Sequence, residues 1–132
     1  MGEIDLAKLC ATMKPVMAPA VYVYCSFPEF NIPTGLPCLC TFRESEGLTA
    51  IVERTEAQRL GVCYTYAARL ITLSVHSSLN AVGFIAVISR TLAEAKIPCN
   101  IIAGYYHDHL LVPVDQADEA MTQLHEISTS AL

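Results

Sequence analysis

The strongest constraint on the fold is a strand, turn and helix pattern between residues 71 and 96. Ile71, Leu73 and Val75 alternate with polar residues, which is typical of a strand with one buried face. A turn at residues 77–83 follows, and its Gly83 opens a helix that is expected to end near Lys96. Apolar residues early in this helix point in nearly all directions, so we expect its first half to be covered on more than one side.

The rest of the second half predicts a hairpin and a last helix. Strands are expected at residues 98–103 and 109–112, joined by the tip "GYYHDH", and Asp115 is expected to cap the final helix. The tail at 128–132 is expected to fray. This βαββα order is typical of a ferredoxin-like unit that lacks its last strand.

The first half predicts a helix, three strands, a second helix and a further strand. The helix spans residues 3–13 and is expected to end at Pro15 and Pro19. Strands follow at 21–25, 38–42 and 48–52, with a proline-rich loop at 26–37. Thr55 is a candidate N-cap for a short helix at 56–60, and residues 62–68 lead into the next strand. This half lacks an opening strand.

A weak internal repeat links the two halves. Residues 51–57 align with residues 111–117, sixty positions later, and each segment has a strand end, a capping position and an alanine. Because each half misses one strand, we expect the halves to exchange strands and complete each other's sheets. The predicted fold is α+β, with ferredoxin-like βαββαβ units in tandem, at residues 1–66 and 67–132, and antiparallel sheets with helices on one face.

Composition narrows the classes of partner. Hydrophobic residues make up 53% of the 132 residues and charged residues 16%, so some apolar surface is expected to be buried in a homodimer. The net charge is −5 with scattered Lys and Arg, which argues against nucleic acid. No apolar run approaches the ~20 residues that cross a bilayer. The acidic start does not match a signal peptide, so a cytoplasmic protein with six reduced cysteines is expected.

The hairpin tip "YYHDH" leaves two interpretations open. His107 and His109 would share one face of a continued strand and could bind a metal ion, with His76 as a third ligand brought close by folding. In that arrangement Asp108 would point the other way. Alternatively the tip is a polar turn, in which Asp108 reverses the chain and the tyrosines pack beside it. An acid–base role would need a nucleophile or a pocket that the sequence does not identify.

The charged turn "RESEG" holds the same place in the first half as "YYHDH" does in the second. Glu44 or Glu46 could take the ammonium group of an amino acid, or a guanidinium group, by a charge-assisted hydrogen bond. The alternative is a solvated hairpin tip, which is the ordinary fate of such residues.

Residues 69–127 resemble an ACT domain, the small-molecule-binding regulatory module found in aspartate kinases, prephenate dehydratases and related enzymes. The segment "RLITLSVHSSLNAVGFIAVISRTLAEAKIPCNIIAG" carries this resemblance. The ACT pattern often has an Asp at the turn, where this chain has Ser77, Ser78 and Asn80. The whole chain also resembles a small bacterial family of stand-alone tandem ACT-like proteins, marked by "CTFRESEGLT", "VHSSLNAVG" and "AGYYHDHLLVP".

The resemblance implies where a ligand binds. In ACT domains the strand-to-helix turn contacts the effector, and the neighbouring strand, here Asn100 and Ile101, forms the other wall. The residues of the turn are Ser77, Ser78, Leu79, Asn80, Ala81, Val82 and Gly83. Backbone N–H groups at a helix start attract a carboxylate. The alternative is an ordinary cap made by Ser78 or Asn80, and for Asn100 a mere anchor of the turn.

The expected function is therefore a non-catalytic sensor that binds a small molecule, most plausibly an amino acid, without a cofactor, and signals to a protein partner. Two other functions remain open. One is a structural or interaction module whose ancestral site is empty. The other is a small metal protein or enzyme that uses His107 and His109.

Overall fold

The computed structural model describes residues 2–129, and these divide into two compact units. Unit 1 combines Met1–Ala18 with Arg69–Leu132, and unit 2 is Pro19–Ala68. Two strands, β1 (Lys14–Phe27) and β4 (Thr65–Ser74), pass through the boundary, so each contributes to both units. The prediction that strands are exchanged between halves corresponds to these two shared strands.

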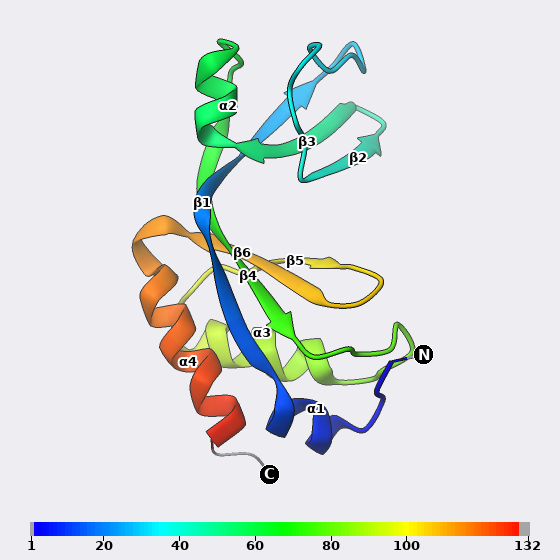
Figure 1. The fold of residues 1–132 in the computed structure, drawn as a ribbon, viewed down its shortest axis with the longest axis vertical. Coiled ribbons are helices and arrows are strands. Elements are labelled where there is room, and N and C mark those ends of the chain that lie inside the picture. Colours follow the sequence, from blue (N-terminus) through cyan, green and yellow to red (C-terminus); the bar gives the residue numbers. More distant parts are fainter. Residues whose placement is uncertain (1, 130–132) are drawn as a thin grey trace. The chain divides into compact units, whose positions relative to one another are not determined.

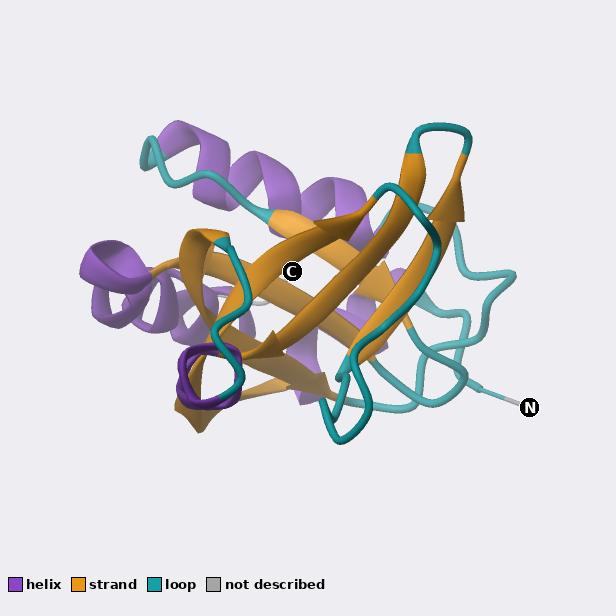
Figure 2. Ribbon diagram, turned by 90° about the horizontal axis from the view of Figure 1, so that it is seen from above, coloured by secondary structure: helices purple, strands orange, loops and turns teal. Residues whose placement is uncertain are grey.

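Unit 1 has the strand order β1-β4-β6-β5. Its helices are α1 (Leu6–Thr12), α3 (Phe84–Glu94) and α4 (Ala117–Thr129), and its remaining strands are β5 (Asn100–Ala103) and β6 (Asp108–Pro113). The run β4-α3-β5-β6-α4 supplies five elements of a ferredoxin-like unit. The start of β1, next to β4, fills the place of the missing sixth. Figures 1 and 2 show the three helices as coils beside these strands.

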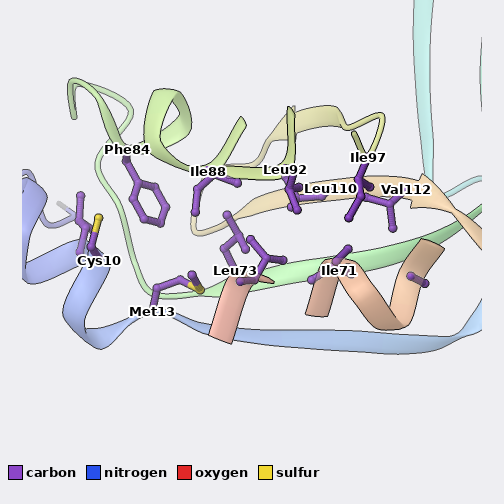
Figure 3. Packing of buried hydrophobic residues seen from close by; sticks show 14 residues of the cluster. Cys10, Met13, Ile71, Leu73, Phe84, Ile88, Leu92, Ile97, Leu110 and Val112 are labelled. Atoms are coloured by element: carbon purple, nitrogen blue, oxygen red, sulfur yellow. The ribbon is translucent and has the colours of Figure 1, made fainter. Parts of the chain in front are cut away.

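One hydrophobic cluster holds unit 1 together, and Figure 3 shows it at close range. Alternate residues of β4 and β6 face the helices; Ile71, Leu73, Leu110 and Val112 are all fully buried. In α3, Ile88 and its neighbours one turn away, Phe84 and Leu92, repeat every fourth residue and meet these strands. Ile85 and Val87 also pack against the cluster, which confirms that the first half of α3 is covered on more than one side.

Unit 2 has the strand order β2-β3-β1-β4 and one helix, α2 (Arg54–Arg59). Antiparallel pairs join β3 (Gly47–Glu53) to β2 (Cys40–Glu44) and to residues 22–27 of β1. A loop at residues 28–39 stands where a ferredoxin-like unit has its first helix. Val23, Cys25, Ala50 and Val52 form the centre of a second, smaller cluster.

Several predicted boundaries were wrong. Pro15 and Pro19 lie inside β1 instead of ending a helix region. The pairing of β1 with β3 starts only at Tyr22, so both prolines lie where one edge of β1 is free of β3 and a missing N–H costs little. Thr55 is the second residue of α2, whose N-cap is Glu53 and makes no side-chain capping hydrogen bond.

The last helix also differs from its prediction. A 3₁₀ turn, η1 (Val114–Gln116), contains Asp115, and no side chain caps it. Ser128 and Thr129 of the predicted frayed tail belong to α4, and residues 130–132 lie outside the described residues.

Candidate functional site

The turn between β4 and α3 is organised by Ser78. The Oγ of Ser78 accepts a hydrogen bond from the N–H of Asn80 (3.0 Å), and the carbonyl of Ser78 accepts one from the N–H of Ala81 (3.0 Å). Ser78 therefore stabilises the turn and does not cap the helix. The N-cap of α3 is Gly83, whose φ of 94° lies in the left-handed region that glycine adopts without steric cost. No side chain caps α3 at this end.

A pocket of about 190 Å³ lies at the start of α3, and we call it the α3 pocket. It is lined by the turn, by Gly83 and the first residues of α3, Phe84 and Ile85, and by Ala103 of β5 and Asp108 of β6. The first N–H groups of a helix have no partner inside the helix and carry partial positive charge. The pocket therefore has an electropositive wall made of backbone.

Asp108 gives the α3 pocket an acidic wall. Only 8% of this residue is exposed, and its Oδ2 accepts a hydrogen bond from the Oγ of Ser77 (3.1 Å). The interpretation in which Asp108 reverses the chain was wrong, whereas Asp108 does lie on the strand face opposite His109, as expected for a continued strand. Asp108 is the first residue of β6, opposite Ala103, and the chain reverses at 104–107, where Gly104 donates to the carbonyl of His107 (2.9 Å).

A sequence signal for Asp108 existed. Asp108, Leu110 and Val112 alternate along one strand, so they share one face. Leu110 and Val112 belong to the buried cluster, and Asp108 extends that face to its polar end, at the α3 pocket.

The two histidines of the hairpin bind separate partners. The Nδ1 of His107 lies 3.1 Å from the carbonyl oxygen of Val75, and the Nδ1 of His109 lies 2.9 Å from the Oγ1 of Thr72. Their ring centroids are 6.4 Å apart. Within residues 2–129, no group of three His, Cys, Asp or Glu side chains is arranged to hold a metal ion. The geometry gives the metal hypothesis no support.

His109 has an unusual electrostatic environment. Burial lowers the pKa of its imidazole, and repulsion from His107 lowers it further, while the negative charge of Asp108 partly opposes both effects. His109 is therefore held in its neutral form to lower pH than a free histidine.

Asn100 and Ile101, the predicted second wall, are not among the residues that line the α3 pocket. Asn100 and Ile101 pair with Leu111 and Leu110 at the beginning of β5. Ala103, three residues and about 10 Å further along the strand, lines the α3 pocket instead. A ligand role for Asn100 and Ile101 stays a prediction.

The predicted acidic residues Glu44 and Glu46 belong to unit 2. The carboxylate of Glu44, at the end of β2, accepts a hydrogen bond from Thr49 of β3. Glu46 is exposed in the turn between these strands. Their contact with an ammonium group stays a prediction, whereas Asp108 already faces the turn inside unit 1.

Fold and sequence together place the chain in a class of regulatory modules. One model of the ACT domain matches residues 1–69, and a second ACT-domain model matches residues 66–126. The chain belongs to the ACT domain family, as the resemblance of its second half implied.

Solved structures extend this result. A Vibrio cholerae protein of unknown function, described as a possible transport protein, is 39% identical over 93% of this chain and 95% of its own, with a TM-score of 0.82. The regulatory subunit of aspartate kinase from Thermus flavus is 10% identical, over 89% of this chain and 98% of its own, with a TM-score of 0.65. The second likeness shows a shared fold. No curated protein matches the chain.

Among residues 2–129, no helix is both long enough and apolar enough to cross a bilayer.

Proposed function

We propose that this protein is a non-catalytic regulatory module of the cytoplasm that binds an amino acid in the α3 pocket. The observation that carries this proposal is one pocket whose lining contains both a helix start and a carboxylate. The uncapped start of α3 is electropositive, and the buried carboxylate of Asp108 is acidic. A zwitterion presents one charge to each wall.

The carboxylate of the ligand would bind the start of α3. The N–H groups of Phe84 and Ile85 have no partner within the helix, and both residues line the pocket. An anion at such a position gains from hydrogen bonds and from the helix dipole. Gly83 carries no side chain that would block the approach.

The ammonium of the ligand would bind Asp108. Ser77 holds one carboxylate oxygen of Asp108, which fixes the orientation of the side chain. A hydrogen bond to a charged group contributes about 1.5–3 kcal/mol, more than a neutral one. Asp108 would thus distinguish an amino acid from a plain carboxylic acid.

The rival function is a structural module with an empty site. Two observations support it. Asp108 already has a hydrogen-bond partner in Ser77, and it lies near the start of α3, where the helix dipole stabilises a carboxylate without any ligand. Under this rival, replacing Asp108 lowers stability and no amino acid changes it.

The protein is further proposed to act as a homodimer. The sheet of unit 1 ends at β5, which pairs only with β6 among the described strands, and an open edge favours pairing with another chain. A signal from the ligand would then pass to a partner protein through the dimer. Sedimentation equilibrium tests this, since a protein that stays monomeric at micromolar concentration contradicts it.

Thermal unfolding with each of the twenty amino acids tests the binding function. An amino acid at 100 times its dissociation constant should add about 2.7 kcal/mol to the stability, which raises Tm by a few degrees. Asp108→Asn should abolish the shift, while Asp115→Asn, an exposed carboxylate at η1, should keep it. If no amino acid raises Tm in the unaltered protein, the proposal fails.

A further inference from the structure

A second pocket lies beside the segment 76–78; it shares Ser78 and Leu79 with the α3 pocket, and its other lining residues are different. It measures about 210 Å³ and is lined by Gly2, His76, Ser78, Leu79, Asn80 and Tyr105. We propose that this tyrosine pocket is a separate binding site for a neutral aromatic ring with a polar edge, such as an indole or a phenol. The proposal does not depend on amino-acid binding in the α3 pocket.

The aromatic wall of the tyrosine pocket is built from rings that already support each other. Tyr105 packs edge-on against Tyr106, with centroids 4.9 Å apart, and Tyr106 packs against His76 at 5.3 Å. Rings held in this way lose little freedom when a ligand arrives. Tyr105 is nevertheless 71% exposed, so most of its surface is open to a partner ring.

Two polar side chains of the pocket, those of Asn80 and His76, are free to bind a ligand. Within residues 2–129, neither the carboxamide of Asn80 nor the ring nitrogens of His76 has a hydrogen-bond partner. A carboxamide offers both donors and an acceptor, and an imidazole offers one or both. A few convergent polar groups on an otherwise apolar wall are typical of small-molecule sites.

The lining of the tyrosine pocket favours a neutral ligand. No Asp, Glu, Lys or Arg lines the tyrosine pocket, in contrast to the α3 pocket with Asp108. A charged ligand would lose hydration there without gaining an ion pair. A neutral ring gains from contact with Tyr105 and Leu79 and keeps its polar edge bonded to Asn80.

The N-terminal segment completes the site. Glu3 forms a parallel bridge with Ser77; its N–H donates to the carbonyl of His76 (2.7 Å), and its carbonyl accepts from Ser78 (2.8 Å). A Cβ added at Gly2 would lie 2.5 Å from the backbone of Ser77. Only glycine therefore allows the chain to approach segment 76–78 this closely and form that wall of the pocket.

Titration with indole tests the proposal directly. The chain has no tryptophan, so indole fluorescence reports binding without a protein background when tyrosine is not excited. Indole should bind saturably, and Tyr105→Ala should weaken it about tenfold, the loss expected for one stacked ring. The matched control is Phe42→Ala in unit 2, since Phe42 is 69% exposed and remote in sequence from the pocket.

Further variants and competitors make the test decisive. Gly2→Val should also abolish indole binding, and benzyl alcohol should compete with indole better than benzylammonium does. Absence of saturable indole binding overturns the proposal, as does equal loss in Tyr105→Ala and Phe42→Ala. It is equally overturned if Tyr105→Ala changes only the sedimentation of the protein, because this surface is then a contact between copies.

Discussion

Asp108 and Gly83 illustrate how single residues define the α3 pocket. Asp108 contributes a buried charge that Ser77 orients, and Gly83 contributes a backbone conformation that leaves the start of α3 uncovered. Neither residue contributes through the size of its side chain. Their substitution should therefore affect ligand affinity more than the packing of the core.

Gly83→Ala should lower the stability by about 1 kcal/mol, because alanine is strained at φ 94°. The added Cβ would lie 3.4 Å from the Cδ2 of Leu6, which is a flexible side-chain end. Gly61→Ala is the matched comparison, since Gly61 has φ 66° with open space around it. Urea unfolding should give similar losses for both, while only Gly83→Ala weakens amino-acid binding. Equal affinities would contradict a role for Gly83 in the site.

The lowered pKa of His109 predicts a pH dependence of stability. Between its folded pKa and the ordinary value of 6.5, the unfolded chain binds more protons than the folded protein. Its contribution is therefore complete above pH 6.5 and is lost as the pH falls through that window. Tm measured from about pH 8 to about pH 5 should fall less steeply in His109→Gln than in the unaltered protein. An unchanged slope in His109→Gln would refute the account.

The sequence around single residues predicted the turn at 77–83 but did not predict that Asp108 lines the α3 pocket. The small residues at 77–83 indicated a helix start that a ligand can approach, because their types alone imply exposed backbone. Asp108 was missed, since an aspartate beside two histidines and a glycine is typical of a turn. Which of two strand faces a helix covers depends on contacts between β6 and α3, and these are distant in sequence.

At the scale of elements, periodicity predicted β4, α3, β5 and β6 to within a few residues. The apolar residues of each element recur at the period of a strand or a helix and pack in the hydrophobic cluster of unit 1. The local sequence pattern therefore agrees with the tertiary contacts. β1 was predicted too short, because Pro15 and Pro19 are strong breakers in isolation. The strand tolerates them where it has no β3 partner, which is a property of the sheet and not of the segment.

The buried face of α3 predicts a large stability loss from truncation. Leu92 is fully buried between strands and helices of unit 1, so Leu92→Ala should cost about 2–5 kcal/mol by lost transfer energy and a cavity. Arg90→Ala on the exposed side of α3 should cost under about 0.5 kcal/mol. Denaturant midpoints measure both, and similar midpoints would contradict the assignment of the buried face.

At the scale of the whole molecule, two strands each serve two units. The order β1-β4-β6-β5 in unit 1 and the order β2-β3-β1-β4 in unit 2 both include β1 and β4. This arrangement explains why each half of the sequence lacks a strand. It also explains how residues near the N-terminus, far from β4 in sequence, come to pair with the turn at Ser77.

Strand sharing predicts cooperative unfolding. Leu73→Ala in unit 1 and Val52→Ala in unit 2 remove buried groups from separate clusters. Because β1 and β4 belong to both units, each variant should lower one common transition observed by circular dichroism and by tyrosine fluorescence. Two transitions, of which each variant shifts only one, would show that the units unfold independently.

The central claim is that the α3 pocket recognises both charges of an amino acid. Calorimetry on the amino acid that raises Tm, and on its analogue without the amino group, tests this with the unaltered protein and Asp108→Asn as a double-mutant cycle. We predict that the analogue binds the unaltered protein at least tenfold more weakly, and that Asp108→Asn removes this difference. If Asp108→Asn weakens both ligands by the same factor, Asp108 does not bind the ammonium group, and the claim is contradicted.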